Sequence, residues 1–182
     1  MARQIINNLN YFQLIIFSIL KTNKFSKQIA KIKKIRRITV FCFLNITLGS
    51  LIGFVLQLIT SKNYNQAFFI VAEILQINLF FIIILILFTP ILYYLAKVMG
   101  GSGTFKSTFL SIASSSGPLL VFWIPYLRLI SLSLIVFILT SNFVQTHKYS
   151  PIKAAINILF PTILFISLLM MLNIIKSPIF LT

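Results

Sequence analysis

The chain holds very few side chains that can carry out acid–base, nucleophilic or metal chemistry. Its 182 residues include a single acid, Glu73, a single histidine, His147, and a single cysteine, Cys42. General acid–base catalysis needs a positioned donor and acceptor, and a metal site needs several ligands close together. One residue of each kind supplies neither. The residue types therefore predict no enzyme, no metal site and no cofactor, and one cysteine rules out an internal disulfide.

The sharpest local motif is the glycine-rich run GGSGTFKST, from Gly100 to Thr108. Three glycines and a lysine suggest a phosphate loop, but neither G-x-x-x-x-G-K-[ST] nor G-x-G-x-x-G is present. We instead expect a turn in which glycine supplies backbone freedom and Ser102 or Thr104 caps the next helix. The residues predicted to shape this inner loop and the kink after it are Gly100, Gly101, Gly103, Phe105 and Pro118.

The composition predicts the kind of fold that must position these residues. Hydrophobic residues make up 59% of the chain and charged residues 9%, whereas soluble domains have about 45–50% and about 25%. Such a chain cannot form the surface of a conventional soluble enzyme, and its 19 Phe exclude a disordered basic tail. We expect an all-α polytopic membrane helical bundle, with a basic amphipathic N-terminal arm (1–37) before a transmembrane domain (38–182).

Apolar segments near the length of a membrane span, about 20 residues, occur five times after the arm. The second lies within a longer apolar run, 68–96, and the third is broken by glycine and proline. An alternative is that the third and fourth form one re-entrant hairpin. The five predicted spans are Ile38–Thr60, Ile77–Ala96, Phe109–Tyr126, Leu129–Val144 and Ala154–Ile175.

The distribution of positive charge predicts the orientation of the chain. Of 16 Lys and Arg residues, nine precede residue 38, four lie in the other predicted inner loops and three lie outside. Basic residues near span ends stay on the inner side. We therefore expect the N-terminus inside and the C-terminus outside, in a bacterial inner membrane or an organelle membrane.

Lysines recur at steps of three or four in the arm, which places them on one face of a helix. Phe25, Ile29, Ile32 and Ile35 fall on another face. A basic amphipathic helix of this kind lies among the headgroups of an anionic inner leaflet; the alternative is that the charges only set topology. No nucleic-acid partner is expected, because base-stacking aromatics are missing. The predicted lipid-surface residues are Lys21, Lys24, Lys27, Lys31 and Lys34.

Small residues inside the spans predict close helix contact. Gly49 and Gly53 form a G-x-x-x-G pair, which serves packing within one bundle or dimerisation. The segment Ser111–Pro118 predicts either a kinked, tightly packed helix or an unwound substrate site.

The remaining polar residues have different predicted roles. Glu73, expected near the outer interface, is the only acid that a proton- or cation-coupled transporter could use. His147 is expected to be solvated in an inner loop. The residues expected to form interhelical hydrogen bonds are Asn45, Gln76, Asn78, Asn157 and Asn173.

The order GGSGTFKSTF, ASSSGPLL, WIP and HKYSPIKAA, over about residues 95–165, resembles the domain of the Yip (Ypt/Rab-interacting protein) family. The resemblance rests on Gly100-Gly101-x-Gly103-x-Phe105-Lys106, Pro118, Pro125 and His147-x-x-Ser150-x-x-Lys153-Ala154.

The resemblance implies a five-span, non-enzymatic membrane protein, and eukaryotic relatives recruit Rab GTPases and shape membranes in vesicle traffic. The short basic arm and a composition typical of an AT-rich genome are closer to bacterial-type members. We expect a scaffold acting through lateral helix contacts with other membrane proteins. The alternatives are an accessory subunit of a larger membrane complex, or a small transporter or channel using Glu73 and Ser111–Pro118.

Overall fold

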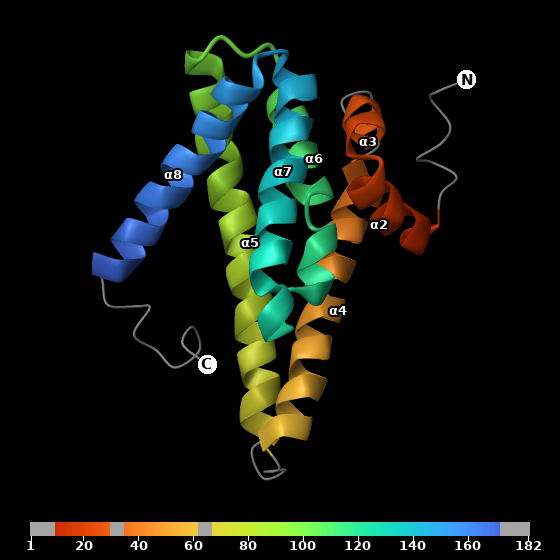
Figure 1. Cartoon of the computed structure of the whole chain (residues 1–182). Helices are drawn as coiled ribbons and strands as arrows, with labels where there is room; N and C mark the ends of the chain where they lie inside the picture. Colours follow the sequence, from red (N-terminus) through yellow and green to blue (C-terminus); the bar gives the residue numbers. More distant parts are fainter. Residues whose placement is uncertain (1–9, 30–34, 62–66, 172–182) are drawn as a thin grey trace.

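The computed structural model describes residues 10–29, 35–61 and 67–171, and in these ranges the regular elements are all helical (Figure 1). This confirms the predicted all-α bundle. The α-helices are α2 (Tyr11–Leu20), α3 (Thr22–Ile29), α4 (Ile35–Ser61), α5 (Ala67–Val98), α6 (Phe105–Ser114), α7 (Arg128–His147) and α8 (Pro151–Met171). Two 3-10 helices, η2 (Gly117–Val121) and η3 (Pro125–Leu127), lie between α6 and α7.

Three helices in the described part of the chain are long and apolar enough to cross a membrane. Their qualifying stretches are Ile35–Leu56 of α4, Asn78–Val98 of α5 and Arg128–His147 of α7. At about 1.5 Å per residue each stretch is about 30 Å long, which matches the hydrocarbon core of a bilayer. They contain most of the first, second and fourth predicted spans. Figure 1 shows the chain descending in α4, ascending in α5 and ascending again in α7.

The third predicted span, Phe109–Tyr126, is not one continuous helix. Helix α6 has 10 residues, about 15 Å, which is half of the hydrocarbon core. The hydroxyls of Ser114 and Ser115 bond back to the carbonyl of Ser111, and Pro118 has no N–H with which to continue the helix. The chain passes through η2 and η3 and then turns back into α7. In Figure 1 this hairpin ends above the lower ends of α4 and α5.

Helix α8 corresponds to the fifth predicted span, Ala154–Ile175. It has 21 residues with Pro161 inside, and its described apolar stretch is Pro151–Phe165. The last residues of the predicted span, 172–175, lie outside the described residues. Figure 1 shows α8 leaving the other helices as it descends from its N-terminal end.

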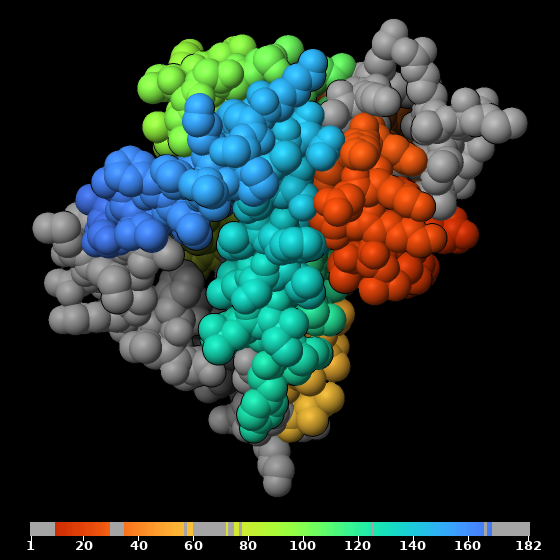
Figure 2. Space-filling view, turned by 45° about the horizontal axis from the view of Figure 1, so that its top comes forward, coloured from red at the N-terminus to blue at the C-terminus, as the bar shows by residue number. Residues whose placement is uncertain are grey.

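Two short helices are described in the basic arm, and the second, α3, lies within the helix expected over residues 21–35. Helix α2 begins with a capping box, in which the Asn10 side chain accepts from the Gln13 N–H and the Gln13 side chain accepts from the Asn10 N–H. Helix α3 buries Phe25 and Ile29 and packs against α6 and α7; the contact with α7 is visible in Figure 2. Phe25 and Ile29 of the apolar face that we expected to meet the lipid are therefore covered by the chain's own bundle, whereas Ile35 is exposed.

Two clusters of buried apolar side chains hold these helices together. One cluster joins α2, α3, α4 and α6, and the other joins α5, α7 and α8. The first consists of Leu14, Phe25, Ile29, Ile38, Phe41, Cys42, Ile46, Leu110 and Ala113. The second consists of Leu92, Leu139, Phe143, Ala154 and Ile158.

Candidate functional site

A row of buried polar side chains lies between α6 and α7, and we call it the polar seam. Residues three or four apart on a helix share a face, so the hydroxyls of α6 form one line and the polar groups at the end of α7 form another. All are at most 7% exposed. The polar seam consists of Thr108, Ser111, Ser114, Ser115, Asn142, Thr146 and His147.

Direct hydrogen bonds connect the two sides of the polar seam. The Ser111 and Thr146 hydroxyl oxygens are 3.0 Å apart. The Asn142 amide donates to the Ser114 hydroxyl at 2.9 Å and to the Ser111 carbonyl at 3.1 Å. In an apolar bundle a polar group without a partner costs several kcal/mol. These bonds therefore fix the register of α7 against α6.

His147 closes the polar seam at the end where α7 stops. Its Nε2 lies 3.0 Å from the Thr108 hydroxyl, and its ring stacks on Tyr149 at a centroid distance of 5.5 Å. The expectation that His147 is solvated in a loop is wrong, because α7 continues past the predicted end of its span and the ring is fully buried.

The glycine-rich loop makes room for the His147 ring. A Cβ on Gly103 would lie 2.6 Å from the His147 Nδ1, and one on Gly101 would lie 2.9 Å from the same atom. The Ser102 N–H donates to the His147 carbonyl at 3.0 Å, which fastens the loop to the end of α7. Gly100 differs, because its φ of +85° favours glycine while the space around it is open.

The predicted turn and cap in this loop are confirmed. Helix α5 ends at Val98 and α6 begins at Phe105, with Thr104 as the N-cap in a capping box with Ser107. The Phe105 ring lies edge-on to Tyr93 at 5.7 Å.

Tyr149 follows α7 and joins the loop region to α8. The Asn157 amide donates to its hydroxyl at 2.6 Å. Burial raises the pKa of the Tyr149 phenol, and the Asn157 hydrogen bond lowers it by less. The phenol therefore stays neutral where it stacks on His147.

The polar contacts continue from the end of α6 to α4 and α2. The Asn45 amide donates to the Ser116 hydroxyl at 3.0 Å, and the Tyr11 hydroxyl donates to the Asn45 side-chain carbonyl at 2.6 Å. Between α5 and α4, the Asn78 amide donates to the Ser50 hydroxyl at 2.9 Å. Interhelical hydrogen bonding by Asn45 and Asn78 is thus confirmed.

Gly49 and Gly53 face the 3-10 region of the same chain. A Cβ on Gly49 would lie 2.6 Å from the Leu119 carbonyl oxygen, and one on Gly53 would lie 2.8 Å from the Trp123 ring. The pair therefore admits the η2 segment close to α4. Pro118 is buried in η2, and its carbonyl accepts a hydrogen bond from the Ser131 hydroxyl.

The predicted basic residues are placed only in part by the described structure. Lys21 is the C-cap of α2, and Lys24 and Lys27 are exposed on α3. Lys31 and Lys34 lie outside the described residues, as do Ile32 of the apolar face and Asn173. Glu73 lies in α5, and its side chain is outside the described part.

The polar seam places a hydroxyl beside an imidazole, with Thr108 Oγ1 3.0 Å from His147 Nε2. A hydroxyl beside an imidazole, as in Thr108 and His147, is the beginning of a nucleophile–base pair. Such a pair needs a third group to orient the base, yet the His147 Nδ1 has no hydrogen-bond partner among the described residues. Both side chains are also fully buried. The arrangement supports helix packing better than catalysis.

Sequence reasoning overlooked the contributions of Asn142, Tyr11 and Trp123. A signal existed for Asn142, because an amide in the middle of an apolar span is costly unless it is bonded within the bundle. It also lies one turn from Thr146, on the face that meets the α6 serines. Tyr11 and Trp123 had no such signal, because their partners are distant in the chain.

Comparison with known protein families finds a match over most of the chain. A family model described as the Yip1 domain matches residues 16–172, from the second half of α2 to just past α8. The match includes the glycine-rich loop, the polar seam and the Gly49–Gly53 pair. No curated protein and no solved structure matches the chain.

Proposed function

We propose that this chain, which belongs to the Yip1 domain family, is a non-enzymatic membrane scaffold or accessory protein acting through lateral contacts of its helices. Family membership, expected from about residues 95–165, holds over a longer part of the chain. Family membership, together with the three described apolar helices of membrane-spanning length, identifies the chain as an integral membrane protein.

The observation that carries the proposal is the division between polar and apolar side chains. Buried polar groups face inward and bond across α6, α7, α4 and α2. Large apolar side chains are exposed on the outside, including Leu79 and Ile86 of α5 and Phe160 and Leu164 of α8. In a membrane such surfaces meet lipid tails or the helices of other proteins. The available surface thus favours lateral contacts over a reaction at one site.

We also propose that the basic end of the bundle faces inward, with the N-terminus inside and the C-terminus outside. The Lys153 ammonium lies 3.4 Å from the Met99 carbonyl, so the loops after α5 and α7 meet at one end. Lys97, Lys106 and Lys148 belong to the same end. The positive-inside rule supports this orientation. It suits a bacterial inner membrane or an organelle membrane, with Lys24 and Lys27 toward anionic lipid.

The orientation can be tested with one added cysteine. Ser150→Cys in a Cys42→Ala background places a thiol in the exposed loop before α8. A membrane-impermeant maleimide should label it only after the membrane is opened. Labelling in sealed, right-side-out vesicles would reverse the proposed orientation.

The scaffold role can be tested by photo-crosslinking in native membranes. A photoreactive amino acid at Leu164, which is exposed on α8, should form adducts with other membrane proteins. The same group at Ala113, which is fully buried, should react only within the chain and serves as the control. Adducts with lipid alone from Leu164, and from equivalent sites on α4 and α5, would contradict the proposal.

A small transporter is the second candidate, and the polar seam is the observation that favours it. Buried polar residues within membrane spans often mark ion pathways, and the Asn142 Oδ1 is buried without a partner among the described residues. Proton or alkali-cation flux into proteoliposomes should then fall in Glu73→Gln and Asn142→Leu. Flux that depends on both residues would overturn the scaffold proposal, and flux equal to that of empty liposomes would exclude the transporter.

A further inference from the structure

Helix α2 presents a continuous apolar stripe away from the bundle. Phe12, Ile16 and Leu20 recur every four residues and are 72%, 56% and 76% exposed. The opposite side of the helix is anchored, because Leu14 and Ser18 are buried. The stripe is therefore a fixed outer surface of the protein.

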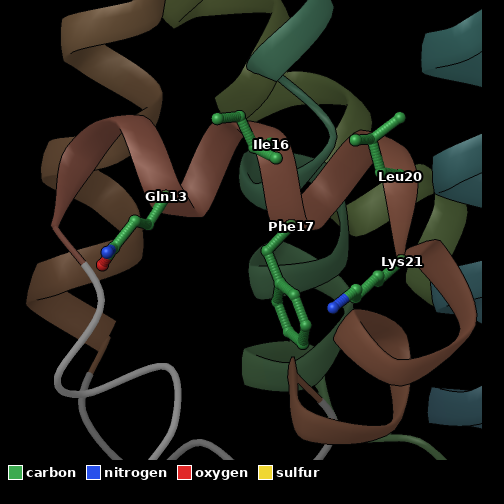
Figure 3. A pocket seen from close by; sticks show the side chains of 5 residues that line it. All are labelled: Gln13, Ile16, Phe17, Leu20 and Lys21. Atoms are coloured by element: carbon green, nitrogen blue, oxygen red, sulfur yellow. The ribbon is translucent and has the colours of Figure 1, made fainter.

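A shallow groove of about 230 Å³ lies along the C-terminal half of α2. Figure 3 shows Ile16 and Leu20 on one side of the helix, with Phe17 and the Lys21 side chain together on another. The volume is below the range of about 300–1,000 Å³ that is typical of small-molecule sites. It suits part of a long, thin apolar group. The groove is lined by Gln13, Ile16, Phe17, Leu20 and Lys21.

The groove ends where the chain changes from apolar to basic. Leu20 is the last residue of α2 and Lys21 is its C-cap, and the exposed Lys24 and Lys27 follow within two turns on α3. An apolar groove that ends in a cation complements an acyl chain joined to a phosphate. The junction of α2 and α3 therefore matches the boundary between acyl chains and headgroups.

We propose that α2 holds one anionic phospholipid, with an acyl chain along Ile16, Phe17 and Leu20 and the phosphate at Lys21. The Lys21 ammonium at the end of the groove favours a lipid over a partner helix, because a lipid phosphate can pair with that cation and an apolar helix face cannot. The site is independent of the proposed scaffold function.

The proposal is tested by counting the lipids bound to the full-length chain. The purified chain in detergent is titrated with phosphatidylglycerol or with phosphatidylcholine of the same acyl chains, and bound lipid is counted by native mass spectrometry. One phosphatidylglycerol per chain should bind more tightly than phosphatidylcholine. Lys21→Gln should weaken phosphatidylglycerol binding about fivefold, because one cation near a lipid phosphate is worth about that factor.

Matched variants distinguish lipid binding at this site from nonspecific effects of charge or of hydrophobicity. Lys148→Gln removes an exposed lysine away from the groove and should leave phosphatidylglycerol binding unchanged. Lys21→Arg keeps the positive charge and should retain phosphatidylglycerol binding. Leu20→Gln should weaken binding of both lipids, whereas Leu168→Gln, on the exposed face of α8, should weaken neither. Circular dichroism confirms that each variant keeps its helices.

Several results would overturn the lipid site. Equal binding of the two lipids, or equal losses in Lys21→Gln and Lys148→Gln, would show that Lys21 is not a specific contact. Displacement of the lipid by inorganic phosphate would show a simple anion site without an acyl groove. A photoreactive group at Leu20 that forms adducts with protein and none with phosphatidylglycerol would assign the stripe to a partner helix.

Discussion

Replacing Gly103 by alanine should destabilise the end of the bundle that holds His147. The new Cβ would lie 2.6 Å from the His147 Nδ1 and 2.7 Å from its Cε1, whereas ordinary contact begins near 3.4 Å. The contact is thus short by 0.8 Å, so the ring or the loop has to move. Overpacking of this kind costs about 1–3 kcal/mol in the free energy of unfolding.

Several contacts prevent the His147 ring from moving at little cost. Its Nε2 is 3.0 Å from the Thr108 hydroxyl, and its faces meet Tyr149 and Phe143 at centroid distances of 5.5 and 5.1 Å. A shift that broke the Thr108 hydrogen bond would add about 1 kcal/mol. We therefore expect the loss to fall in the upper part of the stated range.

The assay is unfolding of the full chain in mixed micelles by titration with SDS, with and without His147→Ala. Without the imidazole ring the clash is gone, so Gly103→Ala should be nearly neutral in that background. Gly100→Ala is the matched control, because it adds about 1–2 kcal/mol of backbone strain at a positive φ in open space. Its cost should be the same in both backgrounds. Equal costs of Gly103→Ala in the two backgrounds would refute the packing argument.

Three further substitutions test the other contacts by the same titration. Gly49→Ala places a Cβ 2.6 Å from the Leu119 carbonyl oxygen and should cost about 1–3 kcal/mol, since backbone yields less readily than a side chain. Asn142→Leu removes the amide hydrogen bonds to α6 and should lower the free energy of unfolding by about 1–2 kcal/mol. Tyr11→Phe removes the 2.6 Å bond to Asn45, which should cost about 1 kcal/mol and speed amide exchange in α2.

The control for Asn142→Leu lies on an exposed part of the same helix. Ser133→Ala on α7 removes a hydroxyl that bonds only to the Leu129 carbonyl in its own helix, and should change little. If Asn142→Leu lowers the free energy of unfolding as little as Ser133→Ala does, the polar seam does not fix the register of α7. If Tyr11→Phe speeds amide exchange throughout the chain and not specifically in α2, the Asn45 bond has no local anchoring role.

The membrane class and the main helices could be predicted because both depend on local apolar length. Helices α4 and α5 contain the predicted spans Ile38–Thr60 and Ile77–Ala96, since an uninterrupted apolar run fixes its own secondary structure in lipid. The Thr104 cap was also predictable, because a cap depends on residues only three apart. Hydropathy gave no comparable information on α6, where serine back-bonding and Pro118 end the helix after half a span.

The environment of α3 could not be predicted from its amphipathic pattern. Periodicity identifies the face that carries Phe25 and Ile29, but lipid and protein are both apolar and either can cover that face. The outcome depends on contacts with α6 and α7, which are distant in the chain. The same reason applies to His147, whose burial requires two glycines more than forty residues earlier in the sequence.

The size of the assembly that contains this chain is the most direct test of a function through lateral contacts. The full chain is extracted gently from its native membrane, and the mass of the particle and its protein components are measured by native mass spectrometry. A scaffold or accessory subunit should appear in a particle with other membrane proteins. A single copy of the chain carrying only lipid, under conditions that preserve other membrane complexes from the same membrane, would contradict the proposed function.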